Sequence, residues 1–283
     1  MKLDNKRVLV TGSNGMFGKF LIKELKKYNC QIIPFSKSEG DVTDFDSLSK
    51  VGKVDIICHL AAIPSVAYSF KNPYEVFKVN SFGTLNVLEF AKQQKVEKFI
   101  FISSYLYGNP NSLPINEKHP LQLGNPYAES KLIAEKYCKN YQELFNFPIL
   151  VLRPFNVYGP DQKNALIPTI KEQIKNNEII LQDLEPKRDY VYIDDVISVI
   201  ISALKSDIKG YEIFNVGFGK SYSVKELLDI IFNLIKKEIP VKNLNQRRQN
   251  EIMDCVADIT KAKKLLHWEP KISLEEGLSK IFL

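Results

Sequence analysis

Short runs of consecutive apolar residues alternate with longer amphipathic segments over the first half of the chain. The apolar runs are Arg7–Gly12, Cys30–Phe35, Val54–Leu60, Lys98–Ser103 and Pro148–Arg153. Continuous rather than alternating apolar patterns indicate parallel strands that are covered on both faces. The segments between them predict helices at Met16–Tyr28, Pro73–Gln94 and Tyr127–Phe145. This alternation predicts an α/β fold with a doubly wound parallel sheet.

The pattern becomes less regular after Arg153. A loop and a short helix come first, and Tyr211–Gly217 then predicts one more strand. Ser223 is the expected N-cap of an amphipathic helix, and two further helices around a proline turn close the chain. We expect a Rossmann domain at 1–153 plus about 189–217, and a small C-terminal α/β substrate domain at about 154–188 plus 218–283.

The composition is that of a globular protein, with 45% hydrophobic and 25% charged residues among 283. The net charge of +6 comes from lysines scattered over helix faces, which favours a solvated surface over a nucleic-acid site. No apolar run approaches the roughly 18 residues of a membrane span. The chain enters its first strand without room for a signal peptide, so we expect a cytoplasmic protein.

The four cysteines are far apart and form no CxxC pair; they are Cys30, Cys58, Cys138 and Cys255. Cysteines that bind metals or carry redox chemistry usually come in close pairs. We therefore expect reduced packing residues, with no disulfide and no metal site.

A glycine-rich segment, TGSNGMFG, follows the first predicted strand and opens the first predicted helix. Gly12 permits a tight turn, Gly15 lets backbone N–H groups approach a pyrophosphate, and Gly18 lets the helix pack closely. The helix N-terminus then faces the negative charge. This context predicts a dinucleotide site, with Asn14, Met16 and Phe17 beside it.

The turn after the second predicted strand has no carboxylate at its first positions. NAD-binding folds usually place an acid there to hold the ribose hydroxyls, whereas this chain has Ser36 and Lys37. Asp41 and Val42 follow and are expected near the adenine, although Thr43 or Asp44 could equally be a helix N-cap.

Tyr127 and Lys131 stand four residues apart in a predicted helix, so their side chains share one face. An ammonium group beside a phenol favours the phenolate and should lower the pKa of Tyr127 toward neutrality. Ser103 and Ser104 end a predicted strand, where open α/β sheets bind ligands. These groups together predict proton transfer beside a nicotinamide cofactor.

The chain resembles the extended short-chain dehydrogenases/reductases that modify nucleotide sugars. The resemblance spans nearly the full length and rests on TGSNGMFG, HLAA, VNSFGTLNVLEFA, FISSYLYG, the Tyr127/Lys131 pair, LRPFNVYGP, KRDYVYIDDV and LLHWEP. It implies that Tyr127 is the acid/base, Lys131 its activator and Ser103, rather than Ser104, the third catalytic group.

The resemblance also implies further binding residues and a homodimer. Those expected at the cofactor are Leu60, Ala61, Ala62, Asn80 and Pro154, and those expected at the nucleotide sugar are Ser104, Tyr105, Asn156, Arg188 and Arg248. Two arginines suit a diphosphate because of the guanidinium fork, although Arg188 could instead form a local ion pair with Asp189. The family pairs the helices predicted at Pro73–Gln94 and Tyr127–Phe145 between two copies.

Three functions remain open at this stage. The family's dehydratases carry an acid pair where this chain has Ser104 and Tyr105, so 4,6-dehydration is not expected. The cofactor turn favours NADP over NAD, because Ser36 removes the usual repulsion and Lys37 could pair with a 2′-phosphate. The passage from Phe35 to Asp41 is as short as in the family's reductases, so the first function is reduction of an NDP-4-keto-sugar, with NAD as the alternative cofactor. Other segments resemble UDP-sugar 4-epimerases that retain NAD, and a catalytically idle nucleotide sensor is the third alternative.

Overall fold

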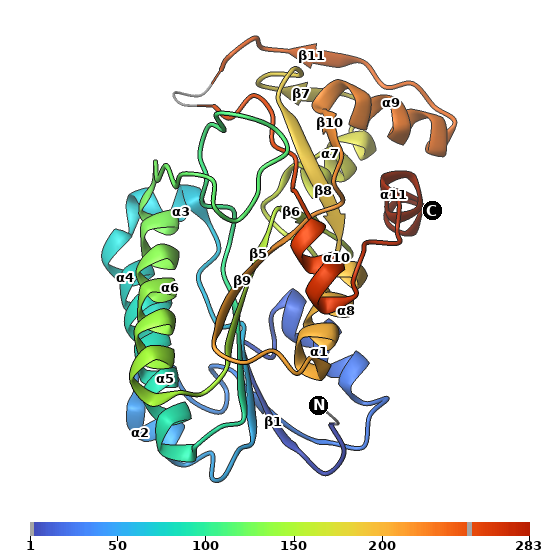
Figure 1. The fold of residues 1–283 in the computed structure, drawn as a ribbon. Helices are drawn as coiled ribbons and strands as arrows, with labels where there is room; N and C mark the ends of the chain where they lie inside the picture. The colour runs from blue at the N-terminus through green and yellow to red at the C-terminus, as the bar shows by residue number, and fades with distance from the viewer. Residues whose placement is uncertain (1–2, 248–250) are drawn as a thin grey trace.

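The computed structural model describes residues 3–247 and 251–283. Its centre is a six-stranded parallel sheet in the order β2-β1-β3-β4-β5-β9 (Figure 1). These strands are β1 (Arg7–Thr11), β2 (Gln31–Phe35), β3 (Ile56–His59), β4 (Lys98–Ile102), β5 (Ile149–Pro154) and β9 (Tyr211–Val216). Every predicted strand is therefore present, with ends that differ by one or two residues.

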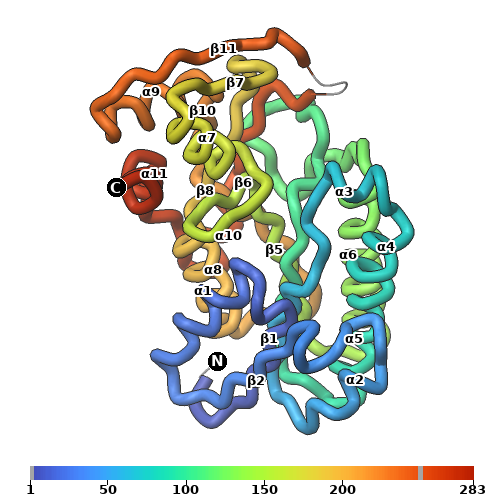
Figure 2. The backbone as a smooth tube through the Cα atoms, turned by 180° about the vertical axis from the view of Figure 1, so that it is seen from behind, coloured from blue at the N-terminus to red at the C-terminus, as the bar shows by residue number. Residues whose placement is uncertain are grey.

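Helices cover both faces of this sheet, which confirms the predicted doubly wound architecture. One layer holds α2 (Phe45–Ser49), α3 (Val66–Lys71), α4 (Pro73–Phe77), α5 (Gly83–Gln94) and α6 (Pro126–Phe145), and the other holds α1 (Met16–Leu25) and α8 (Ile193–Lys205) (Figures 1 and 2). All residues of β4 and β5 are buried. Burial on both faces explains why these strands read as continuous apolar runs.

The single helix predicted at Pro73–Gln94 is wrong in one respect, because a π-helical turn, η1 (Lys78–Phe82), separates α4 from α5. The wider turn carries Asn80, whose side chain bonds both to the loop after β3 and to α6. Single π turns are frequent at functional sites. The helix predicted at Met16–Tyr28 also ends earlier, at Leu25.

The second half adds two small sheets beyond the carboxyl edge of the large one. One has the order β10-β8-β6 and the other pairs β11 with β7. Their strands are β6 (Asn156–Tyr158), β7 (Ile179–Leu181), β8 (Lys187–Tyr192), β10 (Ser221–Ser223) and β11 (Val241–Asn243). The accompanying helices are α7 (Leu166–Lys175), α9 (Val224–Ile235), α10 (Thr260–Leu266) and α11 (Leu274–Phe282). The predicted domain boundaries stay a prediction, and the one at residue 189 falls inside β8.

Local signals for the later helices are confirmed. Ser223 caps α9 through a capping box with Glu226, and Pro270 lies between α10 and α11. The tail is fastened to α8, since buried Asp195 accepts hydrogen bonds from the Lys271 and Ile272 nitrogens at 3.0 and 2.9 Å.

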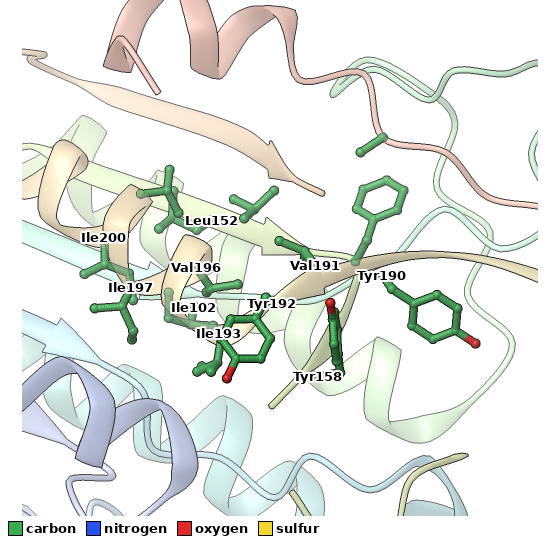
Figure 3. Close-up of a cluster of buried hydrophobic side chains, with 14 of the residues drawn as sticks. Ile102, Leu152, Tyr158, Tyr190, Val191, Tyr192, Ile193, Val196, Ile197 and Ile200 are labelled. Carbon is green, nitrogen blue, oxygen red and sulfur yellow. The ribbon is translucent and has the colours of Figure 1, made fainter. Parts of the chain in front are cut away.

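An aromatic and aliphatic cluster joins the large sheet to the small ones. Figure 3 shows Tyr158, Tyr190 and Tyr192 beside residues of β4, β5 and α8. The rings of Tyr158 and Tyr192 meet edge to face at 5.3 Å. Cys58, Cys138 and Cys255 are buried, as packing residues would be, and Cys30 is partly buried.

Candidate active site

The glycine turn after β1 brings two chain segments into contact. Gly12 has a φ of +68°, a left-handed angle that favours glycine. A Cβ there would lie 2.8 Å from the Ala61 nitrogen, and one at Gly18 would overlap the Gly12 carbonyl oxygen. Gly15, the N-cap of α1, makes no side-chain cap bond. The turn and the uncapped helix start fit a pyrophosphate.

The other residues predicted at the cofactor gather at the carboxyl edge of the sheet. Thr11 Oγ1 accepts hydrogen bonds from the Leu60 and Ala61 nitrogens at 3.1 and 3.2 Å. Asn80 Oδ1 accepts from the Ile63 nitrogen at 2.8 Å, and Asn80 Nδ2 donates to Ser130 Oγ at 3.0 Å. The loop after β3 is thereby tied to β1 and α6. The remaining members lie at the start of α1 (Met16, Phe17), after β3 (Ala62) and at the end of β5 (Pro154).

The buried His59 side chain links β1 to α5 behind the carboxyl edge of the sheet. It does not take up a proton at physiological pH. Its two ring nitrogens lie 2.7 Å from Thr11 Oγ1 and 2.9 Å from Thr84 Oγ1. Burial is the largest cause that lowers its pKa, to about 3, so the imidazole is neutral at physiological pH.

The turn after β2 carries a carboxylate that the sequence prediction overlooked. Glu39 Oε2 accepts hydrogen bonds from the Ser36 nitrogen at 2.8 Å and from Ser36 Oγ at 2.7 Å. Ser38 Oγ donates to Glu39 Oε1 at 2.7 Å, and these hydroxyl bonds lower the pKa of Glu39. Asn14 Nδ2 also donates to Ser36 Oγ, at 2.8 Å. A negative charge therefore stands against Ser36 at the end of β2.

The other residues predicted in this turn, all among those that the structure describes, do not bond to Glu39. Lys37 is exposed. Asp41 Oδ1 accepts from the Thr43 nitrogen at 2.8 Å, and Asp44, one of the two predicted alternatives, is the N-cap of α2. Val42 is buried against the side of Gly83. The signal for Glu39 was available in the sequence, because a serine followed three residues later by an acid is typical of a side-chain-capped turn.

Helix α6 presents the predicted catalytic pair. Asn125 caps its start by accepting from the Ala128 nitrogen at 2.8 Å, and Pro126 occupies the first turn. The Ser104 side chain lies close enough to the hydroxyl of Tyr127 to act on its pKa in the lowering direction. Ser103 Oγ, in contrast, is buried and has no partner among the described residues. Ser104 is therefore the serine that acts on Tyr127 in this structure, and the assignment of Ser103 as the third catalytic group stays a prediction.

The predicted lowering of the Tyr127 pKa is not what the structure shows. Burial raises the pKa of Tyr127, and the nearby Ser104 side chain acts in the opposite direction. Lys131 Nζ instead donates to the Ile102 carbonyl at 2.5 Å and lies 4.4 Å from the centre of the Phe101 ring. Burial lowers the pKa of Lys131 to about 8, and nearby Glu135 acts in the opposite direction.

Two of the residues predicted at the nucleotide sugar, Asn156 and Arg188, line one cavity. This cavity of about 650 Å³ lies beside β6 and β8 and is also lined by Tyr190, Gln246 and Glu251. Arg188 Nη1 donates to the Ile252 carbonyl at 2.5 Å, and Nη2 pairs with Glu251. The alternative pairing with Asp189 is wrong, because that carboxylate accepts from the Phe218, Gly219 and Ala257 nitrogens.

Two further predictions concern Tyr105 and Arg248. The Tyr105 hydroxyl donates to the Gly108 carbonyl at 2.6 Å, and its ring packs edge to face on Phe155 at 5.0 Å. Arg248 lies outside the described residues.

Over residues 3–247 and 251–283, no group of three or more histidine, cysteine or acidic side chains is arranged to hold a metal ion. Within the same ranges, no helix has the length and apolar character needed to cross a membrane.

The geometry can be compared with known proteins. The model of the NAD dependent epimerase/dehydratase family matches residues 8–217. The chain belongs to this family. The match confirms the resemblance drawn from the motifs and the prediction of an enzyme of the extended short-chain dehydrogenase/reductase family.

Individual relatives cover almost the whole chain. A putative UDP-glucose 4-epimerase of Methanocaldococcus jannaschii is 33% identical over an alignment of 302 positions, gaps included, that covers 97% of this chain and 96% of the relative. The crystal structure of UDP-glucose 4-epimerase from Thermotoga maritima with UDP-glucose has a TM-score of 0.89 and 30% identity, covering 97% of this chain and 96% of that one. RMD from Pseudomonas aeruginosa complexed with NADPH also has a TM-score of 0.89, with 28% identity and coverage of 98% and 97%.

Proposed function

We propose that the protein is an NDP-sugar 4-epimerase that works with NAD. The observation that carries this proposal is the Glu39 carboxylate held on Ser36 at the end of β2. A carboxylate at this place can bind ribose hydroxyls and repels a 2′-phosphate. The sequence-based preference for NADP and a reductase rested on an absent carboxylate, and Glu39 supplies one from three residues further along.

The groups around Tyr127 support oxidation and reduction at C4 of the sugar, without elimination of water. When bound, the nicotinamide would supply the acceptor and donor of the C4 hydride. Tyr127, as the phenolate, takes the proton of the 4-hydroxyl as the ketone forms and returns it as the phenol after the sugar has turned over, with Ser104 holding the reacting oxygen. Hydride and proton both return to the sugar, so the reaction has no net redox change. Ser104 and Tyr105 provide no carboxylic acid for expelling water, which argues against 4,6-dehydration.

The cavity beside β6 and β8 supports a nucleotide diphosphate as the handle of the substrate. Arg188 and Asn156 supply hydrogen-bond donors to a space of about 650 Å³. A guanidinium fork suits phosphate oxygens, and Arg188 would exchange part of its bonding with Glu251 for them. The relatives named for UDP-glucose favour UDP as the first nucleotide to test.

The test is to incubate the purified protein with UDP-glucose, UDP-glucuronic acid and UDP-N-acetylglucosamine, without added cofactor. We expect the C4 epimer of one of them, and NAD released on denaturation. Consumption of NADPH with an NDP-4-keto-sugar, and no epimer from any of the three, would contradict the proposal. Glu39→Gln should then improve the use of NADP relative to NAD by about tenfold, whereas Glu24→Gln on the surface of α1 serves as the matched control.

The reductase is the second candidate, and one observation favours it. Lys37 is exposed in the same turn as Ser36 and offers a cation for a 2′-phosphate. RMD, complexed with NADPH, shares the fold at a TM-score of 0.89. A Lys37→Ala variant separates the candidates, because loss of NADPH binding would support the reductase.

A homodimer through the α3–α4–α6 surface is supported by exposed apolar side chains there. Phe70 is 63%, Tyr74 79% and Leu144 65% exposed. Such a concentration of large apolar groups is typical of a protein interface. Sedimentation should give twice the chain mass, and Tyr74→Glu should shift the protein to the monomer.

A further inference from the structure

A buried guanidinium lies behind the predicted catalytic groups. Arg153 in β5 and Glu135 in α6 are each 2% exposed. Arg153 Nε donates to Glu135 Oε1 at 2.9 Å and Nη2 to Glu135 Oε2 at 2.5 Å. A third nitrogen, Nη1, donates to the Tyr107 hydroxyl at 2.9 Å. The planar fork thus contacts a helix with one edge and the loop after β4 with another.

The chain of bonds continues from Tyr107 to Asn215 in β9, the strand beside β5. The fully buried Tyr107 hydroxyl donates to Asn215 Oδ1 at 2.6 Å. Asn215 Nδ2 donates to the Ile115 carbonyl at 2.8 Å, and the Asn215 nitrogen donates to Glu117 Oε1 at 2.9 Å. Each polar end of this chain therefore meets a partner, as buried networks require.

The two elements that Arg153 joins are the ones that meet at the reaction site. Glu135 follows Lys131 by four residues and Tyr127 by eight, so all three share one face of α6. Tyr107 follows Ser104 by three residues in the loop after β4. The position of Arg153 between Glu135 and Tyr107 therefore sets the position of the helix relative to the serine pair.

Stability does not explain why this ion pair is buried. Removing two charges from water costs about as much as their attraction returns, so apolar side chains of similar size would do as well. What an apolar contact cannot provide is the fixed distance and angle of a bidentate pair. This directional bonding is useful where two reacting groups must be held to within about 0.5 Å.

We propose that Arg153, Glu135 and Tyr107 form a clamp that positions Tyr127 against Ser104 for proton transfer. None of the three clamp residues contacts the sugar or cofactor in this scheme. They are positioning residues, and the inference rests on the proposed function only in that Tyr127 is the acid/base. Small displacements of reacting groups cost rate more than binding, so the clamp acts on kcat and leaves KM unchanged.

The first test is Tyr107→Phe, which removes the hydroxyl between Arg153 and Asn215 and keeps the ring. We expect kcat to fall at least tenfold, with KM and cofactor content close to wild type, and the melting temperature to fall because Arg153 Nη1 and Asn215 Oδ1 lose this partner. Tyr211→Phe is the matched control, because its hydroxyl bonds the Glu135 backbone carbonyl at 3.3 Å on the same helix but lies outside the clamp. The control should retain the wild-type kcat.

The second test replaces both charges together, as Glu135→Met with Arg153→Met, so that no buried charge is left alone. This variant should melt near the wild-type temperature and show the kcat loss of Tyr107→Phe. A wild-type kcat in Tyr107→Phe, or an equal loss in Tyr211→Phe, would overturn the clamp even if the double variant failed to fold. A wild-type protein inactive on every sugar would instead refute the proposed function.

Discussion

The two ends of the predicted active site are built in opposite ways. Behind Tyr127 and Lys131, the charges of Glu135 and Arg153 are buried and paired across elements 18 residues apart. At the cofactor turn, Ser36, Ser38 and Glu39 are consecutive or nearly so, and their hydrogen bonds lie at the surface. One end therefore depends on tertiary packing, and the other depends on local sequence.

Because of this difference, substitutions at the two ends should alter different properties of the protein. A buried charge that loses its partner keeps its desolvation cost, so changes at the helix end alter stability as well as rate. An exposed turn exchanges its hydrogen bonds for water, so changes there alter ligand preference with little effect on folding. The following predictions test this comparison.

The largest effect is expected for Tyr127→Phe. The variant loses the only proton that this ring can transfer, so kcat should fall by about 10³-fold, while the folded state and bound cofactor remain. Ser38→Ala in the cofactor turn is the control and should keep turnover. Sugar turnover and cofactor content measure both variants, and full activity in Tyr127→Phe would remove the assignment of the acid/base.

The next effect concerns pH. The folded pKa of Lys131, about 8, lies below its ordinary value of 10.5, so the unfolded chain binds the proton more tightly. Between these values the unfolded state holds more protons, and the free energy of unfolding should rise with pH. Lys131→Met should flatten this rise by about 3 kcal/mol across the window, as measured by urea unfolding. An unchanged slope would show that Lys131 is not effectively buried.

A smaller effect is expected at the glycine turn, where the two regions meet. A Cβ at Gly18 would overlap the Gly12 carbonyl oxygen and lie 2.6 Å from Ser13 Cα, so Gly18→Ala should cost about 1–3 kcal/mol and weaken cofactor retention. Gly124→Ala is the matched control, because nothing lies within 4 Å of its added methyl. Equal urea midpoints for the two variants would mean that the turn can relax.

The smallest effect is expected for Ser36→Ala. The change removes the hydroxyl bonds to Glu39 and Asn14, but the turn is exposed and the Ser36 nitrogen still bonds Glu39. Stability should change by less than about 0.5 kcal/mol, and the NAD-to-NADP preference should fall less than in Glu39→Gln. A loss of several kcal/mol would show that this turn, too, depends on long-range packing.

Predictions from the sequence succeeded where a local pattern carries the structure. The glycine turn, the strands and the start of α6 each follow from a few neighbouring residues, and all are present. The single helix at Pro73–Gln94 failed because Asn80 bonds to Ile63 and Ser130, partners that a helical periodicity does not reveal. The lowered pKa of Tyr127 failed because four-residue spacing places Lys131 on the same face but does not aim its ammonium group.

By itself, the sequence determined the alternation of strands and helices, the glycine turn and the presence of Tyr127, Lys131 and two serines. Apolar periodicity and residue type act over a few positions, so they can be read along the chain. The tertiary structure decided that Ser104 acts on the pKa of Tyr127, that Glu39 turns back onto Ser36, and that Arg153 reaches both Glu135 and Tyr107. These outcomes depend on the directions of side chains that converge from separate elements, and buried polar groups must find partners wherever the fold brings them.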